Sequence, residues 1–425
     1  GTYRVIVTRG PEYDHIERIV DIRPGRIATL EGRLSRVIDS KGWISADFHN
    51  HSTPSGDNYC GTDDRLINLA AEGVEFAPAT EHNRIYEWTP HIERLGLAPF
   101  LATCTGMELT GKGPHLNAFP LTPVPHRQNN GGPEWNPDPR IAALTLRQLP
   151  GDVARRWVQL NHPDVIRNFN DENGDGKADG GYRGLPDFIN AAELFGDGIL
   201  DAPSFNWNAN EKPANAQAWP FAWLQMLNRG IRIWTIAVSD AHATVGSAVG
   251  GWRTYLRSST DDPAKVDVDE LIASAKAGHS FVSTGPFLEV STAEGIGPGG
   301  TIVNQKRVRL RVRVQCNTWT DIDRVAVLVN GRIDPRLDIR RSKRPELFMP
   351  DTTRFHQELL VTLERDAHLI VVAIGENNTL EKAFGDTPRG KLRPIAYHNP
   401  IFVDVDGNGF EPNGDTLDQP YLKLD

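Results

Sequence analysis

The sequence has little cysteine, no long apolar run and no excess of basic residues. Its three cysteines, Cys60, Cys104 and Cys316, are widely spaced and odd in number, which excludes a disulfide framework and a zinc site built from paired thiolates. No apolar run approaches the roughly 18 to 20 residues that a membrane-spanning helix needs. The net charge is −9 over 425 residues. Because phosphate binding needs a basic surface, we expect nucleic acid not to be a partner.

The sequence begins Gly-Thr-Tyr, without Met and without an apolar stretch. We therefore expect the chain to have been processed or trimmed, so that any targeting segment is not visible. The length is too great for one ordinary core, and two or three domains are expected. With 39% hydrophobic and 24% charged residues, the composition is that of a soluble globular protein.

The sequence pattern divides the chain into three parts. Residues 1–42 alternate as β-strands do and contain no convincing helix. Residues 43–285 alternate short apolar segments with amphipathic ones, which is typical of strands and helices in a largely parallel sheet. Residues 286–425 contain β-type runs separated by turns. We therefore predict a β-rich N-terminal segment, a central α/β domain and a C-terminal domain like an antiparallel β-sandwich.

The central part contains seven predicted strands. They cover residues 42–49, 74–82, 100–108, 113–121, 157–163, 190–195 and 234–242. Helices are predicted over residues 63–73, 140–149, 218–230 and 268–278, and several end in glycine, as a C-cap does. Seven strands alternating with helices suggest a closed or nearly closed barrel.

Histidines and acidic residues gather at the ends of these strands. His49 and His51 in the first strand point to one face, because residues i and i+2 of a strand do so. Glu81, His82, Glu108, His162, Asp240 and His242 stand at the ends of later strands, and His115 opens the fourth strand. Active sites of barrels form at this end of the strands. Imidazole and carboxylate together suit zinc, manganese or iron, so the pattern predicts a metal site.

Six short motifs add a resemblance to a known family. "DFHNHS", "TEHN", "GMEL", "GPHLNAF", "NHP" and "SDAH" follow one another in the order and approximate spacing of the polymerase-and-histidinol-phosphatase (PHP) domain. The resemblance covers roughly residues 43–285 and implies a distorted seven-stranded (β/α)7 barrel that holds up to three metal ions. Downstream, "HSFVSTGPFL" and "NPIFVDVDGNG" resemble the carbaryl-hydrolase-type (CehA/McbA-like) subgroup of metallohydrolases.

Carried over position by position, the resemblance implies three sets of metal ligands. The first set is His49, His51, Glu108 and Asp240; the second is Asp57, His82 and His242; the third is His115 and His162, with Glu108 bridging. Asp57 stands where the family often has histidine, and a harder oxygen donor favours manganese or iron over zinc. Glu81 replaces the aspartate of a Thr-Asp-His motif and is expected to lie beside the ligands.

These residues predict a metal-dependent hydrolase, with phosphoester bonds as the first choice of substrate. Two or three zinc, manganese or iron ions would supply hydroxide near neutral pH and clamp the attacking and leaving oxygens, and Glu108, Asp240 and His242 are the predicted catalytic residues. Arg84 is placed either to bind an anionic group of the substrate or as a solvated loop residue. One alternative is hydrolysis of a carboxylic or carbamate ester; another is a non-catalytic metal-binding module. A small-molecule ester is the expected partner, and the oligomeric state is left open.

Two acidic loops fit the spacing of oxygen ligands in a calcium loop. The first offers Asp171, Asn173, Asp175 and Asp179, and the second offers Asp404, Asp406, Asn408 and Asp415. A polar turn cluster is the alternative for both. Weak calcium sites fill more readily outside the cytosol, which favours a periplasmic or secreted location.

Overall fold

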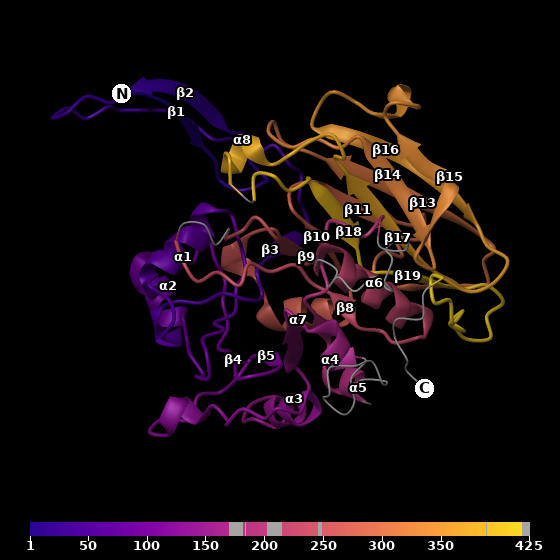
Figure 1. Ribbon diagram of the computed structural model, residues 1–425, viewed down its shortest axis with the longest axis horizontal. Helices are drawn as coiled ribbons and strands as arrows, with labels where there is room; N and C mark the ends of the chain where they lie inside the picture. Colours follow the sequence, from indigo (N-terminus) through magenta and orange to yellow (C-terminus); the bar gives the residue numbers. More distant parts are fainter. Residues whose placement is uncertain (170–181, 183, 202–214, 245–248, 388, 419–425) are drawn as a thin grey trace.

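The computed structural model describes residues 1–169, 182, 184–201, 215–244, 249–387 and 389–418 (Figure 1). Its helices are short: α1 (Thr62–Ala71), α2 (Thr89–Leu95), α3 (Pro139–Arg147), α4 (Val165–Phe169), α5 (Leu185–Phe188), α6 (Asn215–Asn228), α7 (Val268–Lys276) and α8 (Glu381–Phe384). Within those residues, no helix combines the length and the apolar character needed to cross a membrane. Most of the described backbone order comes from sheets.

Four of these helices, α1, α3, α6 and α7, lie where the sequence predicts them. Asp138 caps α3 by accepting a hydrogen bond from the Arg140 amide, and Asp267 caps α7 in the same way. Gly278 follows α7 with φ of +73°, so the expected glycine stop is present. The sequence does not predict helix α2, since its 7 residues are too few for a clear periodic pattern.

The largest sheet joins strands from both sides of residue 285. Its path runs β12 (Thr301–Val303), β19 (Ile401–Asp404), β17 (Ala367–Ile374), β18 (Ile395–His398), β10 (Ser280–Ser283), β9 (Arg253–Arg257) and β3 (Trp43–Ala46), while β14 (Arg324–Val329) pairs with β17 and β15 (Arg332–Arg340). Strand β3 therefore belongs to the same sheet as the C-terminal strands. The domain boundaries at residues 42 and 285 stay a prediction.

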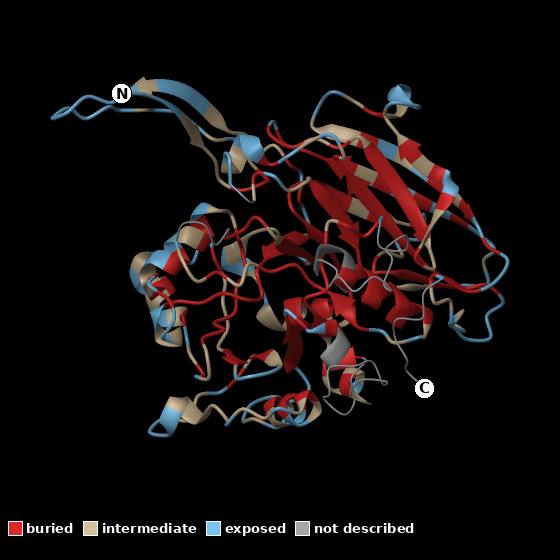
Figure 2. Ribbon diagram, viewed as in Figure 1, coloured by how far each residue is buried: buried red, intermediate tan, exposed pale blue. Residues whose placement is uncertain are grey.

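The central strands of this sheet separate two hydrophobic cores. In β14, Val325 and Val327 face one core, whereas Ala326 and Leu328 face the other. All eight residues of β17 are buried, as expected for a strand covered on both faces (Figure 2). The sheet is thus the wall shared by the C-terminal strands and the part of the chain that carries the site.

A second sheet of β11 (Phe287–Ser291), β13 (Arg307–Gln315) and β16 (Thr353–Thr362) covers one of these cores. In β13, the valines and Leu310 that alternate with exposed arginines are buried, which is the period-2 pattern of a half-buried strand. The hairpin of β1 (Thr2–Val7) and β2 (Ile16–Asp21) extends away from the body and is largely exposed (Figures 1 and 2).

The sheet beside the site has five strands: β4 (Met107–Leu109), β5 (His115–Phe119), β6 (Trp157–Asn161), β7 (Ala191–Ala192) and β8 (Trp234–Thr235). Strands β6, β7 and β8 are parallel, but β4, β5 and β6 are antiparallel, which differs from the largely parallel sheet expected. The short link 110–114 between β4 and β5 explains part of the difference, because a parallel crossover needs a dozen or more residues.

Isolated bridges align the other predicted strands with this sheet. Parallel bridges join Ala46 to Phe76, Phe76 to Ala102, His82 to Glu108 and Asn50 to Ala241. They are single contacts and not ladders, and no barrel closes among the described strands. The fold is mixed α/β, and the seven-stranded barrel stays a prediction.

Buried His368 in β17 makes the fold sensitive to acid. Its Nε2 donates to Asn228 Oδ1 of α6 at 2.8 Å, and burial lowers its pKa to about 3. In the unfolded chain this histidine has a pKa of about 6.5. Between about pH 6.5 and about pH 3 the unfolded chain therefore binds more protons than the folded chain, so the free energy of unfolding falls as the pH drops. Between pH 7 and pH 5 the free energy of unfolding falls by about 2 kcal/mol because of this group. We expect His368→Gln to remove about that part of the acid dependence in denaturant unfolding at both pH values. His356→Gln, at an exposed position of β16, should leave the dependence unchanged, and equal curves for both variants would contradict the prediction.

Candidate metal centre

The strand-end histidines and acids meet in one region and form three overlapping groups. The groups are His49, His51 and Glu108; His51, His82 and His242; and Glu108, His115 and His162. In each group, the ligand atoms lie within 4.8 Å of one another. His51 and Glu108 each belong to two groups. These clustered histidines and the glutamate could hold metal ions.

The floor of the region is buried. The side chains of His49, His51 and Glu108 have no exposed area. His49 Nε2 lies 3.3 Å from Glu108 Oε1 and 3.2 Å from Asp240 Oδ1, and His51 Nε2 lies 3.1 Å from the same Asp240 oxygen. The structure thus brings together the four residues that the resemblance assigns to one ion.

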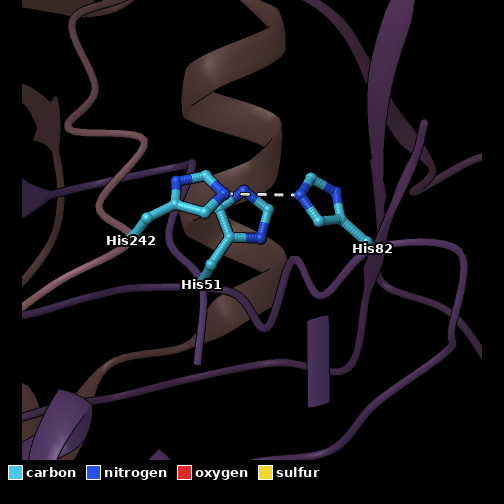
Figure 3. Close-up of side chains that lie close together, drawn as sticks. All are labelled: His51, His82 and His242. Carbon is cyan, nitrogen blue, oxygen red and sulfur yellow. Dashed lines mark hydrogen bonds between the residues drawn. The ribbon is translucent and has the colours of Figure 1, made fainter. Parts of the chain in front are cut away.

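The second group is more open. His51 lies between the rings of His82 and His242, with 4.2 Å between ring centroids on either side (Figure 3). His82 Nε2 lies 3.3 Å from His242 Nε2 and 3.1 Å from Asp57 Oδ2. Asp57, which is 57% exposed, therefore lies with His82 and His242 as predicted, and the structure adds His51 to them.

The third group lies on the other side of Glu108. His115 Nδ1 is 3.3 Å and His162 Nε2 is 3.8 Å from Glu108 Oε1. The same oxygen accepts a hydrogen bond from Asn161 Nδ2 at 2.8 Å, which fixes the carboxylate between the groups.

The hydrogen bonds around the histidines leave one nitrogen lone pair of each ring directed into the region. His49 donates through Nδ1 to Glu193, and His115 donates through Nε2 to the Gly111 carbonyl. His242 donates through Nδ1 to the Asp240 carbonyl, and His82 has the Thr110 hydroxyl next to its Nδ1. Metal-ligating histidines commonly make such contacts through the second ring nitrogen.

The donor set fits divalent metal ions. His49 Nε2 and His51 Nε2 face each other at 2.9 Å, so one of them carries a proton when no metal is bound, and a cation between them would take the place of that proton. Glu108 Oε2, Asp240 Oδ1 and His115 Nδ1 are buried, and among the described residues their neighbours in the centre approach them without the geometry of a hydrogen bond. Buried polar atoms are ordinarily satisfied, so these atoms indicate positions for ligand bonds.

The electrostatic field of the region also favours cations. Burial acts to lower the pKa of His49, but the carboxylates of Asp240, Glu108 and Glu193 outweigh it and raise the pKa well above its usual value. Burial lowers the pKa of His51 to about 4, so this ring is neutral, the form that binds metal. The excess of negative charge that holds a proton on His49 would hold a metal ion in its place.

Glu81 lies beside the ligands, as the sequence predicts, and not among them. Its carboxylate accepts hydrogen bonds from the Ser52 amide and the Ser55 hydroxyl. Because the Ser55 hydroxyl donates to Glu81, it accepts from His51 Nδ1 at 2.9 Å. Glu81 thereby sets which nitrogen of His51 carries the lone pair.

Glu193 is a site residue that the sequence reasoning missed. Its Oε1 accepts from His49 Nδ1 at 2.7 Å and its Oε2 accepts from the His162 amide at 2.7 Å, so it supports residues of two groups. The signal was present, because Glu193 is an acidic residue near the end of the sixth predicted strand, where other strands carry their ligands.

Trp135 supports the loop that leads to His115. Its indole N–H donates to the Pro114 carbonyl at 3.0 Å. A Cβ added at Gly111 would lie 2.1 Å from the indole ring, so the loop packs against Trp135 in a way that only glycine permits. This packing places the Gly111 carbonyl where it accepts from His115.

The remaining predicted residues lie apart or outside the described residues. Arg84 is exposed, and its role in substrate binding stays a prediction. The first calcium loop, with Asp171, Asn173, Asp175 and Asp179, lies outside the described residues. In the second, Asp404 and Asp406 group with Asp366, which the sequence did not indicate, and Asn408 donates to Asp406. Asp415 instead pairs with Arg332 at 2.6 Å. Calcium binding stays a prediction.

Glu193→Gln is expected to weaken metal binding by about tenfold to a hundredfold, as changes beside ligands commonly do. The glutamine side chain has a single acceptor oxygen, whereas His49 Nδ1 and the backbone N–H of His162 are both donors. The NH2 group of glutamine would therefore face one of these donors. Competition with a metal-binding dye measures the dissociation constant. The exposed Glu87→Gln is the matched control, and equal affinities for the two variants would show that Glu193 does not position the histidines.

No family model and no curated protein matches the sequence. Among the solved structures that are similar is a crystal structure of Endonuclease Q in complex with a 27-mer duplex substrate that has an abasic lesion at the active site. The identity is 14% and the TM-score is 0.32, over 55% of this chain and 56% of that chain. The likeness thus spans about half the length of the endonuclease.

This comparison corrects the prediction that nucleic acid is not a partner. The neighbour in the comparison is an endonuclease bound to a nucleic-acid duplex, so the exclusion drawn from net charge is wrong. The value of −9 is a sum over the whole chain, whereas a bound substrate meets a local field. Metal ions at the centre would add positive charge to this region.

Proposed function

We propose that this chain is a metal-dependent hydrolase of phosphoester bonds. The observation that carries the proposal is the pair of groups that share Glu108, whose two oxygens face His49, His115 and His162 on one side and His51 and His82 on the other. A carboxylate shared in this way suits neighbouring ions that act on one substrate. When bound, such ions activate water and stabilise charge on the attacking and leaving oxygens.

The chain's own residues divide into a buried floor and an open rim. His49, His51 and Glu108 are fully buried and hold a fixed geometry, since their partners leave few alternative positions. Asp240 and His242 have side chains about one third exposed, at 36% and 33%. We assign them the contact with substrate, because they reach both the centre and solvent.

Hydrolysis of a carboxylic or carbamate ester is the second candidate, because the same centre could polarise a carbonyl group. The two candidates differ in the number of oxygens that bear charge in the transition state. Paired ions stabilise an in-line displacement at phosphorus through both the attacking and the leaving oxygen. We therefore rank the phosphoester first.

The test is an activity panel on protein stripped with a chelator and reloaded with Mn, Zn or Fe. The substrates are p-nitrophenyl phosphate, bis-p-nitrophenyl phosphate, p-nitrophenyl acetate, 1-naphthyl methylcarbamate and an oligonucleotide duplex. We expect metal-dependent release from at least one phosphoester and little from the other esters. A protein that binds none of these metals would overturn the proposal, and turnover of the carbamate or acetate alone would select the second candidate.

A further inference from the structure

A cavity of about 230 Å3 opens beside the metal centre. His162, Glu193 and Asp240 form one part of its wall, so the cavity adjoins the metal centre at His162 and Asp240. A group bound there would be held next to any phosphoester bound by the centre.

Apart from Ser239, the rest of the cavity is lined by apolar and aromatic side chains. Phe195, Trp219, Ile236, Val238 and Trp252 line it. Segment 236–240 supplies both Ile236 and Val238 and the centre's Asp240, so cavity and centre share a backbone support.

The aromatic walls are held in place by contacts outside the cavity. Trp219 donates its indole N–H to the Pro163 carbonyl at 3.0 Å, next to His162. Phe195 stacks on buried Tyr397 with 5.4 Å between ring centroids and contacts Trp252 at 5.8 Å. Trp252 in turn lies under the Arg389 guanidinium, 5.0 Å from its ring centroid. Fixed aromatic walls are typical of sites that bind a flat apolar group.

A second cavity, which shares His162, has a different character. Its volume is about 460 Å3, and it is lined by Lys112, Asn161, Asp164 and Asn168 together with Trp135. His162 therefore stands between a polar side and an apolar side. The apolar side has the more selective lining, since few polar side chains there could satisfy a hydrophilic group.

We propose that the apolar cavity is a specificity site for a flat, apolar ring attached to the phosphoester. A cavity of about 150 Å3 is enough to hold benzene, so the volume here admits a ring and its attachment. The proposal deepens the function proposed above and rests on it, because the ring is held only if the phosphorus group lies at the centre.

Binding of two phosphonates to Mn-loaded protein tests this. Methylphosphonate and phenylphosphonate carry the same anionic group and differ in the ring. We expect calorimetry to give phenylphosphonate about tenfold to a hundredfold tighter binding, which is the effect of burying one ring. Trp252→Leu should reduce that ratio at least several-fold and leave methylphosphonate binding unchanged.

Two further variants keep the result interpretable. Val238→Phe fills the cavity and should weaken only phenylphosphonate binding, and Phe100→Leu, at an exposed aromatic residue elsewhere, should change neither. Equal binding of both phosphonates, or a ring preference that survives Trp252→Leu and Val238→Phe, would overturn the specificity site and leave the proposed function intact. Failure of both phosphonates to bind the metal-loaded protein would overturn the proposed function and this inference with it.

Discussion

Replacing Glu108 with glutamine is expected to cause the largest loss of metal and activity of any single change. The carboxylate has three histidines near Oε1 and two near Oε2, and it is the one acid in two of the three groups. An amide removes the negative charge and turns two N–H bonds toward atoms that already direct lone pairs inward. Metal analysis should show the loss of at least one equivalent, and activity should fall about a hundredfold to a thousandfold, since a metal ion supplies several kcal/mol to the transition state.

Two matched variants separate the charge from the geometry of Glu108. Glu108→Asp keeps the charge but shortens the side chain, so it should bind more metal than Glu108→Gln and less than the unchanged protein. Glu289→Gln, a partly buried glutamate of β11 that pairs with Arg313, should retain full metal content. Circular dichroism checks that each variant is folded. Unchanged metal content in Glu108→Gln would rule out a shared ligand.

Local pattern was enough to find most of the site. Glu108 lies in β4 and His162 directly follows β6, close to the predicted positions. Strands β3 and β8 end earlier than predicted, at Ala46 and Thr235, so His49, His51 and His242 lie in the segments that follow them. Glu193 carries the same signal at the end of β7 and was passed over. The sequence therefore held the information needed to include Glu193.

The sequence does not show which distant strands and side chains pair with one another. Strand β3 pairs with β9, more than two hundred residues away, and the same sheet continues into the C-terminal strands. Asp415 fits the calcium spacing but pairs with Arg332, a basic residue far from it in sequence. Such pairings depend on the packing of whole elements, which local propensity does not contain.

His82 and His242 come from distant parts of the chain and meet in the second group. Their Nε2 atoms are 3.3 Å apart, and both lie near Asp57 Oδ2, at 3.1 Å and 3.5 Å. We expect His82→Ala and His242→Ala each to lose the same single metal equivalent and a similar part of the activity. The double variant should be scarcely worse than either single variant, because groups that act as a unit are not additive.

The contrasting pair is His82 and His115, which belong to different groups. The double variant of this pair should lose two metal equivalents, whereas the variant lacking His82 and His242 should lose one. Bound metal is counted because all the ions can act on the same reaction. Activity losses would then be non-additive for both pairs and could not distinguish them. If removal of His82 and His242 together releases two equivalents, these histidines hold separate ions, and the second ligand set is wrong. If instead the pair of His82 and His115 releases only one, the centre binds fewer ions than its three groups suggest.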